Sequence, residues 1–124
     1  METSQAVRTT AQVANRLVEL CRTGQYEAAQ EELFADDATS AEPAFTNAPV
    51  VKGRQAIIEK GKEWAQSVKE FHGTTLSEPI IGGDYFSVAS STDVTFHKSG
   101  RMTIEEINVY HVKNGQVVSE QFFY

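Results

Sequence analysis

Cysteine is nearly absent from this chain of 124 residues, which contains only Cys21. A lone cysteine excludes an intrachain disulfide and is typical of a reducing compartment, so a cytoplasmic location is expected. Cys21 falls on an apolar stripe with helical spacing, which favours a packing role over a reactive thiol. The first residues show no charged segment followed by an apolar one, so no secretory signal is expected.

Basic residues are scarce, since 11 Lys and Arg stand against 17 Asp and Glu and the net charge is −6. Binding to a phosphate backbone needs clustered positive charge, so this balance argues against nucleic-acid partners. Long apolar runs and basic amphipathic stretches are also missing. We therefore expect neither a membrane span nor attachment to a membrane surface.

The chain also lacks the motifs that hold metals and nucleotide cofactors. Its three histidines have no metal-ligand spacing, HExxH does not occur, and no glycine-rich phosphate loop or serine nucleophile elbow is present. We expect no metal and no cofactor. The 40% of hydrophobic residues is enough for the core of one domain spanning residues 1–124.

Three helices are predicted in the first part of the chain. Apolar residues recur at helical spacing over 5–22, with Thr3 or Ser4 as the cap and Gly24 at the end. A shorter helix is predicted from Tyr26 to about 34. The third helix is predicted over 54–71, where one face carries Ile57, Gly61, Trp64, Val68 and Phe71.

Strands follow the helices. Alternating patterns predict strands over 74–80, 85–97, 101–113 and 116–124, separated by glycine-containing turns. A short strand over 39–42 is expected after a break at 35–38, and 43–52 reads as a loop. Helices first and an antiparallel meander afterwards indicate an α+β fold, with the helices on one face of a curved sheet.

Both faces of the last two predicted strands carry apolar residues. In a sheet with one solvent-exposed face, apolar and polar side chains alternate along each strand, and they do not alternate in these two strands. The outer face is therefore expected to be covered, most simply by a second copy of the chain, giving a homodimer. The expected contact residues are Ile107, Val109, Val117 and Phe123.

The turn at Asn114-Gly115 leaves two registers open between these strands. A three-residue loop would place Asn108 opposite Glu120, and the same register would pair Glu106 with Phe122 and Ile104 with Tyr124. A two-residue turn would instead place Glu120 opposite Val109, away from Asn108. The sequence does not decide between them.

The order of several short motifs resembles a known superfamily. These are ADDAT at 35–39, Glu42-Pro43, KGRQAI at 52–57 and the final NGQVVSEQFFY. Together they resemble the nuclear transport factor 2-like superfamily, in its SnoaL-like and ketosteroid isomerase-like branch. The resemblance implies a cone-shaped, curved antiparallel sheet, or cystatin-like roll, with three N-terminal helices on its concave face. It also favours the three-residue turn, an enclosed pocket and a dimer through the outer sheet face.

The same resemblance implies roles for individual residues. Glu42 matches the position of the carboxylate general base of ketosteroid isomerase, and Asn108 matches the acid that donates to the substrate oxyanion. Leu17 takes the place of the oxyanion tyrosine. An amide donates more weakly to a developing enolate than a carboxylic acid does, so steroid isomerisation by the same oxyanion hole is not expected.

Three inward-facing acids, Glu42, Glu106 and Glu120, carry the chemical hypothesis. Carboxylates that share an apolar pocket repel, so at least one pKa should rise and allow acid–base catalysis. The competing interpretation is that each acid pairs with a base, caps the backbone or faces water. The expected ligand-binding residues, besides the catalytic candidates Glu42, Asn108 and Glu120, are Glu106, Tyr124, Phe122, Trp64, Asp93, Leu17 and His72.

Two functions of different classes follow from these residues. The first is a cofactor-free acid–base enzyme, of isomerase, cyclase or hydratase type, that acts on a small apolar carbonyl or cyclic compound. The alternative is a module that binds a small ligand without catalysis, or a dimerisation module. An acid with a raised pKa beside an open pocket would favour the enzyme.

Overall fold

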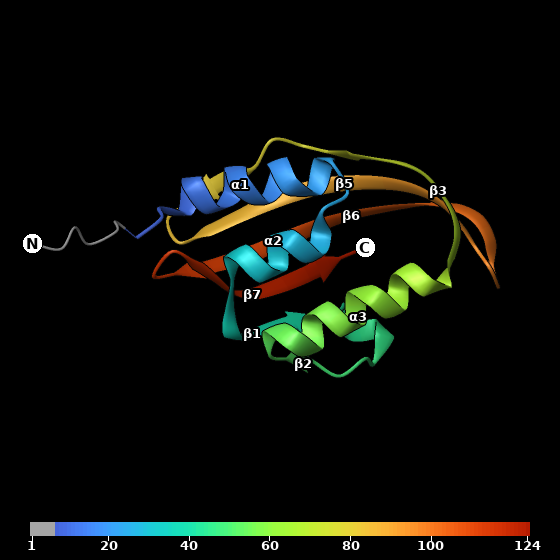
Figure 1. Cartoon of the computed structure of the whole chain (residues 1–124), viewed down its shortest axis with the longest axis horizontal. Coiled ribbons are helices and arrows are strands. Elements are labelled where there is room, and N and C mark those ends of the chain that lie inside the picture. Colours follow the sequence, from blue (N-terminus) through green and yellow to red (C-terminus); the bar gives the residue numbers. More distant parts are fainter. Residues whose placement is uncertain (1–6) are drawn as a thin grey trace, which may run out of the picture.

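The computed structural model describes residues 7–124 and shows an α+β architecture (Figure 1). Within these residues the helices are α1 (Thr10–Arg22), α2 (Tyr26–Leu33) and α3 (Arg54–Ser67), with a 3-10 turn η1 at Ala44–Thr46. The strands are β1 (Phe34–Ala41), β2 (Val51–Lys52), β3 (Val68–Leu76), β4 (Ile80–Gly82), β5 (Tyr85–Phe96), β6 (Gly100–Lys113) and β7 (Gln116–Phe123).

The start of α1 differs from the prediction. The helix begins at Thr10 rather than at residue 5, and the predicted caps Thr3 and Ser4 lie outside the described residues. Thr9 caps the helix through a capping box: its hydroxyl accepts from the backbone of Gln12, and the Gln12 side chain accepts from the backbone of Thr9. The predicted end is confirmed, because Gly24 follows with a positive φ of 75°.

The strand β1 starts directly after α2, so the predicted break at 35–38 is wrong. The first half of the strand is irregular: Phe34 and Ala35 are buried, Asp36 and Asp37 are exposed, and the register with β7 shifts between Phe34 and Thr39. The two aspartates, which look like a turn signal in sequence, lie in this irregular part of the strand. Alternation begins at Ala38, which is buried together with Ser40, and the backbone oxygen of Ala38 accepts from Gly53 at 2.7 Å.

The third helix ends at Ser67, four residues before its predicted end. Val68 and Phe71 belong to β3, which pairs with β5 from Val68 opposite Phe96 to Leu76 opposite Ser90. Their spacing of three residues continues the helical stripe and does not fit a regular strand, so periodicity favoured the helix. The strand contains both residues because its register with β5 shifts between Val68 and Glu70 and again between Phe71 and Gly73. Long-range pairing with β5 decided the outcome, as tertiary context often does for β-branched and aromatic residues.

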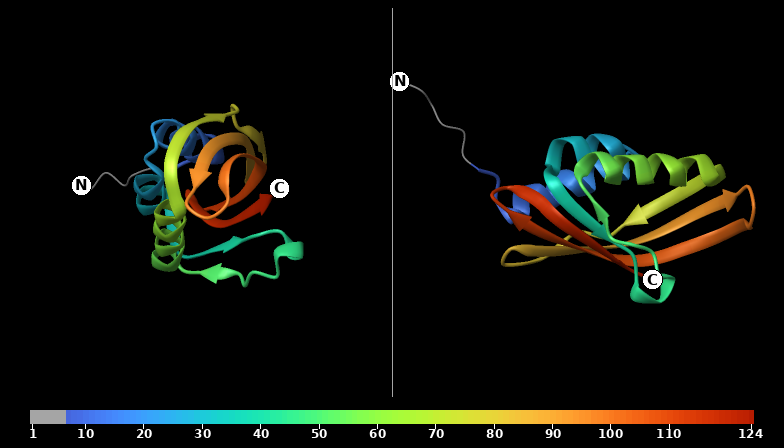
Figure 2. Two further views of the ribbon diagram at one scale, coloured as in Figure 1. Left: turned by 90° about the vertical axis from the view of Figure 1, so that its right-hand side faces the viewer. Right: turned by 90° about the horizontal axis from the view of Figure 1, so that it is seen from below.

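The sheet is curved, and the helices cover its concave face (Figure 2). Its strand order is β2-β1-β7-β6-β5-β3, with β4 paired to β5 outside this path. The meander from β3 to β7 is antiparallel as predicted, but β1 pairs in parallel with β7 and makes the sheet mixed. The predicted α+β cone is confirmed, with β1 and β2 extending the sheet beyond the predicted meander.

The core fills one half of the concave face. Phe86 stacks on Tyr110 with ring centroids 4.7 Å apart, and side chains of α1 and α2 pack over them. Fully buried members from the helices and strands include Val13, Val18, Leu33, Phe34, Phe86, Val88 and Val117. This cluster anchors the helices to the sheet through apolar burial.

The other half of the concave face is open. Phe71 and Met102 both pair with buried Val94 and so point to the concave side, yet they are 47% and 44% exposed. Trp64 on α3 was expected mainly as a core residue, but it is 40% exposed and meets Phe96 edge to face at 6.0 Å. We call this set of Trp64, Phe71, Phe96 and Met102 the open apolar half.

The convex face carries exposed apolar side chains. Ile107 and Phe123 face each other in the register of β6 and β7, and both are about half exposed. Tyr85 is equally exposed and stacks on His111 at 4.4 Å. Val117 was expected on this face, but the structure buries it completely in the core.

Candidate functional site

The β6–β7 turn has two residues, so the predicted three-residue loop is wrong. Asn114 and Gly115 have φ values of 51° and 73°, and Lys113 pairs directly with Gln116. Two consecutive positive φ angles are typical of a type I′ turn. A side chain at Gly115 would also meet the backbone nitrogen of Arg8 at 2.9 Å, so glycine fits this position for a second reason.

A β-bulge then shifts the register by one residue. Val112 pairs with Val117, but the next pair is His111 with Ser119, which leaves Val118 without a partner. Glu120 consequently lies opposite Tyr110, and Asn108 lies opposite Phe122. The two-residue register therefore holds for the first two pairs after the turn, and beyond the bulge neither predicted register is the observed one. The shift nevertheless keeps Glu120 and Asn108 on the same concave face, because residues paired across strands share a face.

Glu120 is the most deeply buried acid of this face, with 6% of its surface exposed. It pairs with Ser40 where β1 and β7 run in parallel. Burial is the main cause that raises the pKa of Glu120 to about 7, and the nearby carboxylates of Glu42 and Glu106 add to it. The Ser40 hydroxyl and the ammonium group of Lys60 oppose this rise.

Glu42 follows the end of β1 and is held on both carboxylate oxygens. The Nζ of Lys60 lies 2.6 Å from its Oε2, and the hydroxyl of Tyr124 donates to its Oε1 at 2.7 Å. Partial burial and the adjacent Glu42 carboxylate raise the pKa of Tyr124 to about 12. Phe45 covers this corner by meeting the Tyr124 ring edge to face at 6.0 Å.

Asn108 and Glu106 are consecutive inward positions of β6. With its amide nitrogen turned towards Glu106, as its surroundings require, Asn108 donates to Oε1 of Glu106 at 3.2 Å and to the backbone oxygen of Ile107 at 3.3 Å. Burial and the Glu42 carboxylate raise the pKa of Glu106, while the Asn108 amide and Lys60 oppose the rise. We call Glu42, Glu106 and Glu120 the acid cluster.

The acid cluster lies at the border between the packed core and the open apolar half. Along the concave face of β6, Tyr110 belongs to the core, Asn108 and Glu106 follow, and Met102 lies in the open half. Two surface hollows of about 390 and 420 Å³ lie elsewhere, at the β6–β7 turn and beside the β5–β6 turn. The acids line neither of these hollows.

Three of the predicted ligand-binding residues lie away from the acid cluster. Leu17 is buried in the core, with 2% of its surface exposed. Asp93 is on the convex face, where Arg101 binds it with two contacts of 3.1 and 2.9 Å and lowers its pKa. The alternation of β5 puts it there, because its neighbour Val94 is the inward residue.

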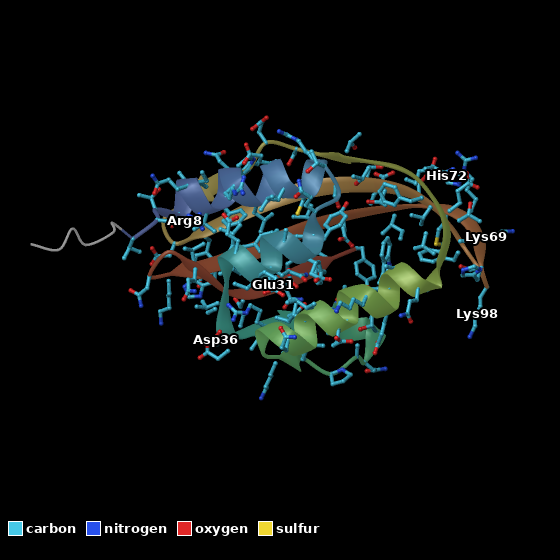
Figure 3. The ribbon with its side chains drawn as sticks, viewed as in Figure 1. Arg8, Glu31, Asp36, Lys69, His72 and Lys98 are labelled. Carbon is cyan, nitrogen blue, oxygen red and sulfur yellow. The ribbon has the colours of Figure 1, made fainter. Side chains whose placement is uncertain are left out.

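His72 is also displaced, because it belongs to β3 rather than to the end of a helix. Its Nε2 lies 2.7 Å from the Thr95 hydroxyl, and its Nδ1 lies 3.6 Å from Glu70. Figure 3 shows His72 near Lys69 and Lys98, at the far end of the long β5–β6 hairpin. Of the remaining predicted residues, Phe122 lies under Lys60, with the ammonium nitrogen 4.9 Å from the ring centroid.

Sequence reasoning missed Lys60 and Ser40. Lys60 lies three residues after buried Ile57 on α3, so the helical spacing that indicated Trp64 also carries Lys60 towards the concave side. Ser40 follows Ala38 by two residues on β1, and both are fully buried. Recognising β1 as a strand of eight residues would have predicted Ser40 as inward-facing.

Within the described residues, no three His, Cys, Asp or Glu side chains are grouped in a way that could hold a metal ion. No helix in residues 7–124 is long and apolar enough to cross a membrane.

The fold and the inward acids define an α+β cone of the nuclear transport factor 2-like class. A family model of the SnoaL-like domain matches residues 8–124, and the chain belongs to that family. A candidate SnoaL-like polyketide cyclase from Mesorhizobium loti, also described as a carbohydrate phosphatase, is 34% identical with a TM-score of 0.88. That match covers 94% of this chain and 100% of the other.

More distant structures share the fold. A protein from Catenulispora acidiphila with a ketosteroid isomerase-like fold, solved with trimethylamine, is 15% identical over 94% of this chain and 87% of its own, with a TM-score of 0.72. IdmH, a candidate polyketide cyclase from Streptomyces antibioticus, is 16% identical over 94% and 91%, with a TM-score of 0.70. A search of curated proteins found no match.

Proposed function

We propose that this SnoaL-like domain is a cofactor-free acid–base enzyme that acts on a small, largely apolar carbonyl or cyclic compound. The reaction is of isomerase, cyclase or hydratase type. Glu42 serves as the base, Glu120 as its acid partner, and Asn108 orients the substrate oxygen. The observation that carries the proposal is the buried Glu120, whose pKa is raised to about 7 beside two further inward acids.

The pKa of Glu120 supports acid–base chemistry at neutral pH. A group with a pKa of about 7 is present there in both protonation states, so it can deliver and recover a proton in one cycle. The surroundings of Glu42 differ, because the ammonium group of Lys60 lies 2.6 Å from its Oε2 and the hydroxyl of Tyr124 donates to its Oε1 at 2.7 Å. Two neighbouring acids in different environments can thus take the two roles that a proton shift needs.

The open apolar half supports an apolar substrate. Phe71, Met102 and Trp64 keep 40% or more of their surface exposed on the concave side, which is unusual for large apolar residues on the inner face of a sheet. A ligand lying against them would have one end beside Glu106 and the acid cluster. Apolar walls with a few convergent polar groups are typical of small-molecule sites.

The description of the Mesorhizobium loti relative as a candidate polyketide cyclase agrees with a cyclase-type reaction. Two residues of this chain argue against steroid isomerisation by the usual oxyanion hole. Leu17 has no donor and is buried in the core, and Asn108 donates only an amide hydrogen that already contacts Glu106.

The test is a carboxyl-detected NMR titration of the protein, without ligand and then with a panel of apolar ketones and cyclic compounds. We expect Glu120 to titrate near 7 and to shift on addition of a compound that binds at the open apolar half. A compound that binds is then tested for turnover. If Glu120 titrates at its ordinary value, the acid–base proposal fails and the alternative of a non-catalytic ligand-binding module is favoured.

We also propose that two copies of the chain pair through the convex sheet face. The support is the exposed apolar set of Tyr85, Ile107 and Phe123, with partly exposed Val109 between them. Apolar surface of this kind on one sheet face is typical of an interface between protein chains.

A further inference from the structure

Lys60 contacts the acid cluster through Glu42 and also contacts two side chains beside it. Its Nζ lies 2.6 Å from Oε2 of Glu42 and 3.1 Å from the hydroxyl of Ser40. The same ammonium group stands 4.9 Å from the centroid of the Phe122 ring. Two of its contacts are therefore to polar groups and the third to an aromatic face, which leaves the ammonium group well fixed.

The neighbouring basic residues of α3 are engaged elsewhere. Arg54 contacts Asp36 at 2.7 Å, and Lys62 lies 3.7 Å from Glu59 on the exposed side of the helix. The acid cluster thus contains three carboxyl groups beside one ammonium group. If all three were ionised, two negative charges would remain unbalanced in a half-buried space, which is costly.

We propose that Lys60 is the positioning residue of this site. Lys60 holds Glu42 as a carboxylate and connects it to Glu120 through Ser40, so that the proton of the cluster resides on Glu120. The geometry supports this division, because the short contact joins Lys60 to Glu42 while Ser40 lies between Lys60 and Glu120. The inference rests on the proposed function, since it assigns which acid begins the reaction ionised.

The other titratable groups around the cluster do not supply a positive charge. Cys21 of α1, Tyr26 of α2, Tyr110 of β6 and Tyr124 after β7 all have raised pKa values, so they are neutral at pH 7. Glu106 of β6 can only add negative charge or a proton. Among the groups named here, the charge balance of the cluster therefore depends on Lys60.

The experiment compares Lys60→Met, Lys60→Arg and Lys62→Met by carboxyl-detected NMR titration. Removing the charge of Lys60 should raise the proton affinity of Glu120 by about tenfold, since Lys60 lowers the pKa of Glu120 and a nearby opposite charge shifts a carboxyl by about one pKa unit or more. Lys60→Arg keeps the charge and should restore most of the wild-type titration of Glu120. Lys62→Met removes an equal charge from the exposed side of the same helix and should leave the titration of Glu120 unchanged.

A substrate, once found, gives a second measurement. The acidic limb of the pH–rate profile should move to higher pH in Lys60→Met and return in Lys60→Arg, which a purely structural role would not produce. If Lys60→Met does not fold, Lys60→Gln serves instead, because it removes the charge and keeps a polar amide at this position.

The outcomes separate this inference from the proposed function. If Glu120 titrates in a folded Lys60 variant as it does in the wild type, the role of Lys60 is refuted while the acid–base proposal stands. If Glu120 of the wild type titrates at its ordinary value, the acid–base proposal fails by itself. A shift of Glu120 in the Lys62 variant as large as in the Lys60 variant would also refute the inference.

Discussion

Replacing Glu120 by Gln should make the protein more stable at alkaline pH and leave its stability nearly unchanged at acidic pH. The side chains have almost the same size, and the amide can still accept from Ser40. What changes is the charge, because glutamine cannot ionise. The wild type must keep an ionised carboxyl in a position that is 6% exposed whenever the pH is well above its pKa.

The magnitude follows from the pKa of Glu120, which rises from 4.5 in the unfolded chain to about 7 in the folded protein. Each pKa unit corresponds to about 1.4 kcal/mol, so full ionisation costs the folded state roughly 3 kcal/mol. Below pH 4.5 both states are protonated and the cost is absent. Between 4.5 and about 7 the unfolded chain releases the proton first, so the wild-type stability falls as the pH rises and then levels off.

Urea unfolding at fixed protein concentration, at a series of pH values from 4.5 to 8, measures this difference directly. The gain in stability of Glu120→Gln over wild type should grow through this range and level off near pH 8. Glu105→Gln is the matched control, because Glu105 lies on the exposed convex face of β6 and should give no such growth. A difference between wild type and Glu120→Gln that does not change with pH would refute the reasoning.

Other outcomes test the site and the surface. Glu42→Gln should keep the fold but lower turnover by on the order of a hundred- to ten-thousand-fold, measured as kcat on any substrate found, and full activity would exclude Glu42 as the base. Glu42→Gln should also lower the pKa of Tyr124 from about 12 towards its ordinary value in a spectroscopic titration, because the Glu42 carboxylate 2.7 Å away helps to raise it; an unchanged titration would contradict the contact. Val109→Lys should dissociate the proposed dimer in sedimentation experiments, because a buried interfacial charge costs several kcal/mol; a wild type that is monomeric at micromolar concentration would remove the dimer proposal.

The sequence predicted the architecture well, because its signals were local and ordered. The end of α1 at Gly24, the short helix from Tyr26 and the long hairpin of β5 and β6 all follow from glycine positions and apolar periodicity. The end of α3 was missed because Val68 and Phe71 continue the helical spacing, whereas the strand that contains them is irregular. Only the pairing of β3 with β5 distinguishes the strand from the helix.

The site was harder to predict because it depends on contacts between distant segments. The acid cluster was recognised as three inward acids, but its partner Lys60 belongs to another element, and the 2.6 Å contact with Glu42 has no local signal. Asp93 was misplaced because its face depends on the register of a hairpin end. Sequence spacing alone could not show that Asp93 lies on the convex face, where it makes a bidentate contact with Arg101.

The unpaired Val118 has a consequence for how this strand tolerates insertions and deletions. Because the bulge absorbs one surplus residue, a chain that lacked Val118 could keep the pairs His111–Ser119 and Tyr110–Glu120 and would lose only the irregularity. Relatives that differ by one residue here would present the same carboxylate to the concave face. A sequence alignment that matches residues one by one from the Asn114-Gly115 turn, without a gap, would then place the equivalent acids in adjacent columns. In such an alignment a relative would seem to lack the glutamate, although its strand presents the same carboxylate.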